Sequence, residues 1–176
     1  MRRRDAGLIM RIHVLSHSEA ESFLEKNAGE FDVLFVAAEP VPGVEETLQA
    51  RSREMLRLYF HDAIDPWPDV KLPTADHVSR ALDWASGRPQ LVVTCAAGIS
   101  RSSALAYLLW CRAMPPELAV QQLNQDRHMP NELVVRLGAE ALGNQAIFST
   151  FSEWRDATQQ LWQARARLET QPKEST

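Results

Sequence analysis

Residues 91–113 constrain the fold of this chain more than any other segment. The apolar run 91–93 is typical of a buried strand, and the mostly apolar segment 102–113 is typical of a buried helix. Only a short loop that contains Gly98 joins them. A strand, a tight loop and a helix start form a cradle for an anion, because loop N–H groups can turn inward and the helix adds the positive end of its dipole.

Two side chains give this loop its chemistry. Cys95 opens the loop and Arg101 closes it six positions later. The arginine can donate two parallel hydrogen bonds to a phosphate group, and the positive field around it favours a nucleophilic thiolate on Cys95. The residues predicted to bind phosphate are Ala96, Ala97, Gly98, Ile99, Ser100 and Arg101. The alternative is a buried structural cysteine beside a surface arginine.

Composition narrows the class of protein. A chain of 176 residues fits one domain with a core of its own. The net charge of -4 argues against a general nucleic-acid binder. With two cysteines, the chain does not suggest a disulfide framework, and a nucleophilic cysteine requires a reducing compartment. We expect a cytoplasmic monomer with no signal peptide, no metal and no membrane partner, since no apolar run approaches the roughly 20 residues that span a bilayer.

Strands alternate with helices along the chain. Strands are predicted at residues 12–15, 31–37, 55–60 and 91–94. Helices are predicted at 18–27, with Ser18 as the N-cap and Glu21 completing a capping box, and at 74–86, 102–113, 116–127, 131–142 and 147–168. Residues 39–43 are predicted to break the chain, and residues 170–176 to form a disordered tail. The pattern predicts one α/β domain over residues 1–169, with a mostly parallel sheet flanked by helices and a helical C-terminal part.

The sequence Cys-x5-Arg-Ser resembles the signature loop of the cysteine-dependent protein tyrosine phosphatases. The compact length resembles their dual-specificity branch and its bacterial tyrosine-phosphatase-like relatives, over about residues 55–114. The resemblance implies hydrolysis through a cysteinyl-phosphate without a cofactor, in which Ser102 stabilises the departing thiolate; Ser102 could also be a helix N-cap. The family usually has histidine before the cysteine, whereas Thr94 stands there in this chain.

Such a reaction also needs a general acid to protonate the leaving oxygen. Three aspartates are candidates: Asp62, Asp65 and Asp69. Trp67-Pro68-Asp69 spells the acid loop of the larger tyrosine phosphatases. The family spacing, a little over thirty residues before the cysteine and just past a strand, instead favours Asp62, which precedes Cys95 by 33 positions. The alternative for Asp65 and Asp69 is turn formation beside proline.

The predicted substrate is a singly phosphorylated group, above all protein phosphotyrosine or a small phosphate monoester. The loop interior has no lysine, whereas relatives that act on polyanionic phosphoinositides often carry basic residues there. Trp67 and Tyr59 are candidates for lining a pocket for an aromatic ring, or alternatively packing residues. Thr94 favours a second hypothesis, a pseudophosphatase that binds phosphoproteins without turnover. Sulfur transfer or arsenate reduction by Cys95 is a third.

Overall fold

Four parallel strands form one sheet at the centre of the molecule, in the order β1-β4-β2-β3. The computed structural model describes residues 10–169. The strands are β1 (Arg11–Ser16), β2 (Asp32–Ala37), β3 (Met55–Tyr59) and β4 (Gln90–Cys95). Because β4 pairs with both β1 and β2, it is an inner strand, and its carboxyl end lies between the ends of two neighbouring strands. Ligands of parallel sheets bind at this edge.

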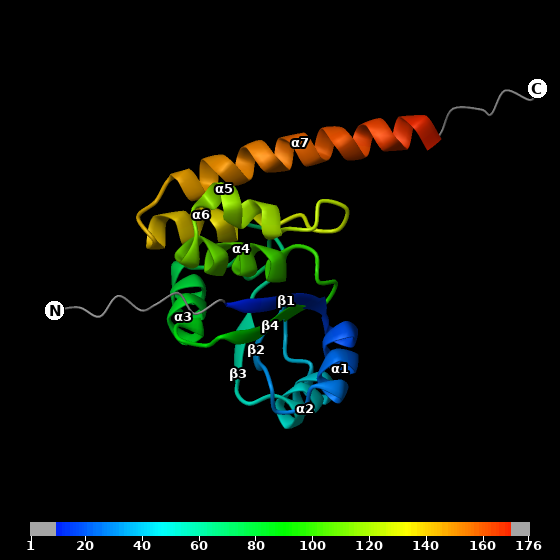
Figure 1. Ribbon diagram of the computed structural model, residues 1–176, viewed down its shortest axis with the longest axis vertical. Coiled ribbons are helices and arrows are strands. Elements are labelled where there is room, and N and C mark those ends of the chain that lie inside the picture. Colours follow the sequence, from blue (N-terminus) through cyan, green and yellow to red (C-terminus); the bar gives the residue numbers. More distant parts are fainter. Residues whose placement is uncertain (1–9, 170–176) are drawn as a thin grey trace, which may run out of the picture.

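Helices cover both faces of the sheet (Figure 1). α1 (His17–Lys26) and α2 (Pro42–Arg51) lie on one face, and α3 (Ala75–Ala85) and α4 (Arg101–Ala113) lie on the other. Every residue of β2 is buried, as expected for a strand that is covered on both sides. The structure therefore confirms the predicted single α/β domain with a parallel sheet flanked by helices.

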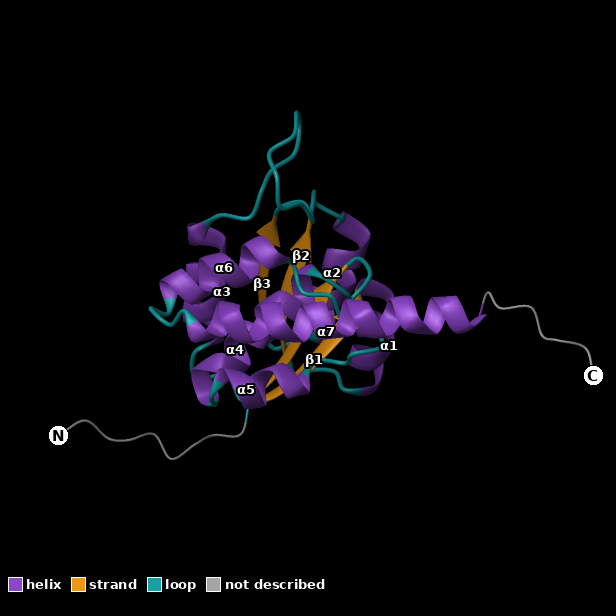
Figure 2. Cartoon of the chain, turned by 90° about the horizontal axis from the view of Figure 1, so that it is seen from above, coloured by secondary structure: helices purple, strands orange, loops and turns teal. Residues whose placement is uncertain are grey.

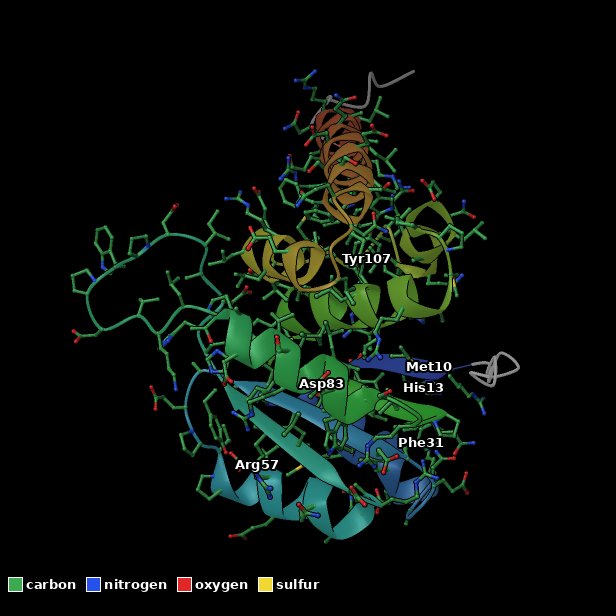
Figure 3. The ribbon with its side chains drawn as sticks, turned by 90° about the vertical axis from the view of Figure 1, so that its left-hand side faces the viewer. Met10, His13, Phe31, Arg57, Asp83 and Tyr107 are labelled. Atoms are coloured by element: carbon green, nitrogen blue, oxygen red, sulfur yellow. The ribbon has the colours of Figure 1, made fainter. Side chains whose placement is uncertain are left out.

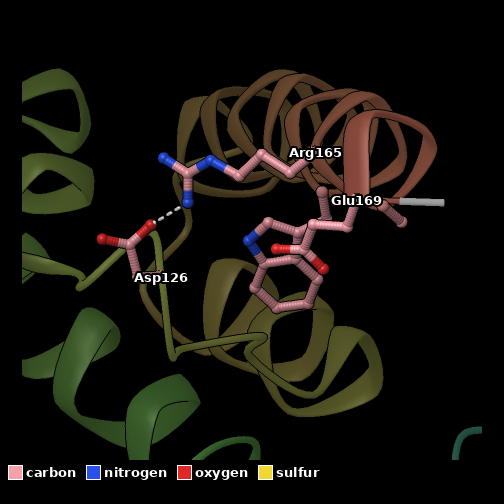
Figure 4. Close-up of a pocket in the computed structure, with 5 residues that line it drawn as sticks. Asp126, Arg165 and Glu169 are labelled. Atoms are coloured by element: carbon pink, nitrogen blue, oxygen red, sulfur yellow. Dashed lines mark hydrogen bonds and ion pairs between the residues drawn. The ribbon is translucent and has the colours of Figure 1, made fainter. Parts of the chain in front are cut away.

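The helical C-terminal part forms an outer layer over α4. It comprises α5 (Pro116–Ala119), the 3-10 turn η1 (Val120–Gln122), α6 (Glu132–Ala141) and α7 (Ala146–Glu169). The buried Tyr107 of α4 donates a hydrogen bond to the Ile147 carbonyl of α7 (2.8 Å). Farther along α7, the Trp162 ring N–H donates to the Gln125 carbonyl (2.9 Å), and Arg165 pairs with Asp126 (Figure 4). No helix among residues 10–169 combines the length and apolar character needed to cross a membrane.

The predicted N-cap of the first helix was wrong by two residues. The capping box uses Ser16 and Glu19, not Ser18 and Glu21. The pattern Ser-x-x-Glu occurs in both frames, so the sequence alone could not choose between them. In the structure β1 continues to Ser16, which pairs with Cys95 across the sheet, and the helix starts directly after it.

Two other predictions were wrong in part. The predicted break at 39–43 is confirmed for residues 39–41, but its last two residues belong to α2. Pro42 stands in the first turn of this helix, where a missing N–H costs nothing. The predicted helix 116–127 stops at η1. Asn124 ends it, since its side chain accepts from the Asp126 N–H (2.9 Å) and its N–H donates to His128 Nδ1 (2.9 Å). The predicted tail 170–176 lies outside the described residues.

Candidate active site

The predicted nucleophile and the predicted phosphate-binding arginine lie at the two ends of one loop. Cys95 is the last residue of β4, and Arg101 is the first of α4. The Cys95 sulfur lies 3.1 Å from the Ser102 hydroxyl, and both side chains are buried. The N-cap position of α4 belongs to Ser100, so the alternative that Ser102 is an N-cap was wrong. The Ser102 hydroxyl instead contacts the sulfur.

Arg101 is held in a defined orientation. Its Nη1 donates a hydrogen bond to the Phe60 carbonyl (3.0 Å), which fixes the buried guanidinium beneath the end of β3. Its Nε is also buried but forms no hydrogen bond within residues 10–169. An unpaired buried donor on a charged group is energetically costly. The arrangement therefore suits an anionic oxygen that accepts from this nitrogen.

Gly98 lets the loop approach β1. Its φ of 65° lies in the left-handed region that disfavours side chains. A Cβ at this position would lie 2.4 Å from the Ser16 nitrogen and 2.6 Å from the Leu15 carbonyl carbon. The positive φ and the close approach together explain why glycine occupies this position.

The segment 127–131, which we call the strap, runs alongside the loop and binds its carbonyl groups. Three hydrogen bonds join them: Arg127 Nη2 to the Ala97 carbonyl (3.2 Å), the Met129 N–H to the Ile99 carbonyl (3.1 Å) and the Asn131 N–H to the Ser100 carbonyl (3.2 Å). In a trans peptide the N–H points away from the C=O. With these carbonyls turned to the strap, the N–H groups of the following residues point to the opposite side, as an anion cradle requires.

An ion pair anchors the first residue of the strap. Glu19 accepts hydrogen bonds from both terminal nitrogens of Arg127 (2.7 and 2.5 Å) and from the Ser16 N–H (2.7 Å). The hydrogen bonds from Arg127, followed by the one from Ser16, lower the pKa of Glu19 to about 2. Glu19 is therefore a carboxylate at neutral pH, and the charge of Arg127 is already paired.

Of the three candidate acids, the structure brings only Asp62 to the loop. Its Oδ1 accepts hydrogen bonds from Ser100 Oγ (2.7 Å) and from Asn131 Nδ2 (2.8 Å). Asp65 and Asp69 lie farther along the loop between β3 and α3, are exposed, and form no hydrogen bond or ion pair within the described residues. This loop stands out from the body of the molecule (Figures 2 and 3).

The base of that loop is closed by two hydrogen bonds between the same residues. The His61 N–H donates to the Lys71 carbonyl (2.7 Å), and the Lys71 N–H donates to His61 Nδ1 (2.9 Å). Trp67, near the far end, is 76% exposed. Tyr59 does not line an open pocket, because its hydroxyl donates to Glu45 Oε2 (2.8 Å) and burial with this hydrogen bond raises its pKa to about 12.

The residues around Cys95 supply little additional charge. Thr94 is fully buried, and its hydroxyl forms no hydrogen bond within residues 10–169. His17 stacks on Phe35, and its Nε2 lies 3.1 Å from the Val36 carbonyl. Burial, with a smaller contribution from Arg101, lowers the pKa of His17, so this ring is neutral at neutral pH. Among the described residues, no three His, Cys, Asp or Glu side chains gather as metal ligands would.

Sequence reasoning missed Glu19, Arg127 and Asn131 as residues of this site. They reach the loop from α1 and from the segment before α6, at sequence separations that no local motif spans. The weak signal was Asn131 itself, a polar residue directly before an apolar helix, which is typical of an N-cap.

Solved phosphatase structures are similar to this chain. Cydia pomonella PTP-2 phosphatase matches with a TM-score of 0.55 and 18% identity, over 74% of this chain and 84% of that one. Tk-PTP in the active form (TM-score 0.42, 17% identity, 88% and 99% of the two chains) and human DUSP28 (0.37, 21%, 85% and 94%) also match. No protein-family model and no curated protein matches the sequence. The first match shows a fold of the protein tyrosine phosphatase type, which confirms the predicted resemblance at the level of fold.

Proposed function

We propose that this chain, which has a phosphatase fold, hydrolyses phosphate monoesters through a cysteinyl-phosphate intermediate, with protein phosphotyrosine as the favoured substrate. One observation carries the proposal. The loop that begins with the Cys95 sulfur ends with the buried, unpaired Nε of Arg101, so a nucleophile and a donor that lacks a partner among residues 10–169 belong to the same turn.

The mechanism has two steps. The Cys95 thiolate attacks phosphorus, the bond to the leaving oxygen breaks, and protonated Asp62 gives its proton to that oxygen. Asp62 then removes a proton from water, water attacks phosphorus, and the S–P bond breaks. The Ser102 hydroxyl, 3.1 Å from the sulfur, stabilises the departing thiolate. Arg101 and the N–H groups of the loop hold the equatorial oxygens in both transition states.

Charge around the cradle favours a singly phosphorylated substrate. The loop interior carries no lysine, and the nearby Arg127 is already paired with Glu19. Arg101 therefore supplies the unpaired guanidinium for the anion, which suits one phosphate group better than the several of a phosphoinositide. A nucleophilic cysteine requires a reducing compartment, so we propose the cytoplasm, with no cofactor and no nucleic-acid partner.

The direct test is hydrolysis by the purified wild-type chain. Initial rates of phosphate release are measured on matched phosphotyrosine and phosphoserine peptides and on a phosphoinositide. We expect the highest kcat/KM on the phosphotyrosine peptide. Binding of that peptide with no phosphate release would contradict the proposal and favour a pseudophosphatase, for which the unpaired Thr94 hydroxyl is the supporting observation. Sulfide or arsenite release without phosphate release would point to the third hypothesis.

Substitution of the acid tests the assignment of Asp62. We expect Asp62→Asn to lower kcat on the phosphotyrosine peptide by about 10²- to 10⁴-fold with little change in binding, since a general acid acts in the transition state. Asp65→Asn and Asp69→Asn are matched controls in the same loop. Asparagine tolerates the positive φ of 62° at Asp69, so this control preserves the backbone. A large loss in the Asp69 variant and none in the Asp62 variant would reverse the assignment.

A further inference from the structure

Asn131 is a buried residue whose polar groups all form hydrogen bonds, several of them with residues of the site. It is 5% exposed and stands at the N-cap of α6. Its side-chain oxygen accepts from the Val134 N–H (3.1 Å), and its own N–H donates to the Ser100 carbonyl. Because an oxygen must face the Val134 N–H, the group that faces Asp62 is the NH2, which can only donate.

This NH2 group connects the helix to the proposed acid. It donates to Asp62 Oδ1 (2.8 Å) and to the Ala63 carbonyl (3.3 Å). Asp62 itself is exposed and begins a protruding loop, so hydrogen bonds rather than packing determine where its carboxyl group lies. Ser100 provides the other hydrogen bond to the same oxygen. With Oδ1 held by two donors, Oδ2 forms no hydrogen bond within the described residues and is free to carry a proton.

We propose that Asn131 is a positioning residue that holds the Asp62 carboxyl group over the cradle. The Asn131 amide is then needed most for substrates whose leaving group needs a proton. This inference rests on the proposed function. The strap then has two roles, because the segment that binds the carbonyl groups of the loop ends at Asn131, the residue that orients the acid. Misplacement of a reacting group by about 1 Å can cost about 10²-fold in rate.

Leaving-group dependence separates this role from a purely structural one. Phenolate is strongly basic, so phenyl phosphate depends on the acid, whereas p-nitrophenolate delocalises its charge and leaves with less help. Asn131→Ser is the variant of choice, because serine is a good N-cap for α6 but is too short to reach Asp62. We expect kcat on phenyl phosphate to fall about tenfold to a hundredfold, and kcat on p-nitrophenyl phosphate to fall less than about threefold.

A matched control and a double variant complete the experiment. Asn144→Ser makes the same substitution at the exposed start of α7, where the Asn144 side chain accepts from the Ala146 N–H (3.1 Å), and it should change neither rate. In an Asp62→Asn background, Asn131→Ser should add less than about twofold on phenyl phosphate, because the group it positions is gone. Should Asn131→Ser unfold the chain, Asn131→Asp keeps the shape and the cap while removing the donor.

The outcomes distinguish this inference from the proposed function. Equal losses on both esters, or additive losses in the double variant, would overturn the role of Asn131 while leaving the phosphatase intact. A wild-type chain that hydrolyses neither ester would overturn both. A leaving-group effect in the Asp62 variant together with none in the Asn131 variant would mean that Ser100 alone orients the acid.

Discussion

Cys95→Ser is expected to abolish turnover and to leave binding of a phosphotyrosine peptide nearly unchanged. A serine hydroxyl has the size of the thiol but is a far weaker nucleophile at neutral pH. We expect kcat to fall by at least about 10⁴-fold, as for the loss of a covalent nucleophile elsewhere. The Arg101 guanidinium and the loop N–H groups remain, so calorimetric titration with the peptide should give a dissociation constant close to that of the wild type.

Cys111→Ser is the matched control for the nucleophile. Cys111 lies on α4, at the end far from the cradle, and burial raises its pKa to about 12. Its thiol therefore stays protonated and unreactive, and the variant should retain activity. If Cys95→Ser kept a substantial rate, or if Cys111→Ser lost it, the nucleophile would have been misidentified.

Arg101→Lys is expected to reduce kcat/KM by about 10³-fold, within the range for the loss of an arginine that stabilises a transferring phosphoryl group. The guanidinium donates from Nη1 to the Phe60 carbonyl, while Nε has no hydrogen-bond partner among the described residues. An ammonium is a point charge without this planar fork, so it cannot hold the carbonyl and face the phosphate in the same way. Both KM and kcat should worsen, as measured by steady-state kinetics on the phosphotyrosine peptide.

Arg80→Lys provides the comparison for this substitution. Arg80 is exposed on α3 and forms a long ion pair with Asp76 (3.9 Å), so either cation should serve there. Thermal unfolding of both variants separates a loss of chemistry from a loss of fold. Retention of nearly full kcat/KM by Arg101→Lys would show that charge alone, without the fork, accounts for phosphate binding.

The part of the site that could be predicted from the sequence is the part that is local in the sequence. A stretch of eight residues contains Cys95, Gly98, Arg101 and Ser102, so their chemistry and spacing can be recognised from one short segment. The strands were also predictable, because apolar runs bounded by turns mark buried strands of a parallel sheet. Asp62 was favoured by its place just past β3, and the structure brings it to the loop.

The rest of the site could not be predicted, because it depends on contacts between residues that lie far apart in the sequence. Arg127 reaches Glu19 across 108 positions, and Asn131 reaches Asp62 across 69. The segment that precedes the strap was predicted to be helical over residues 116–127. Local hydrogen bonds of Asn124 end the helix and free the chain to run beside the loop. Local side-chain hydrogen bonds thus outweighed a modest helix propensity.

Peptide groups, rather than side chains, shape most of the proposed anion receptor. The strap binds the carbonyl oxygens of Ala97, Ile99 and Ser100, and this fixes the direction of the N–H groups of residues 98, 100 and 101. Such a receptor tolerates broad replacement of amino acids as long as Gly98 and the flanking Cys95 and Arg101 persist.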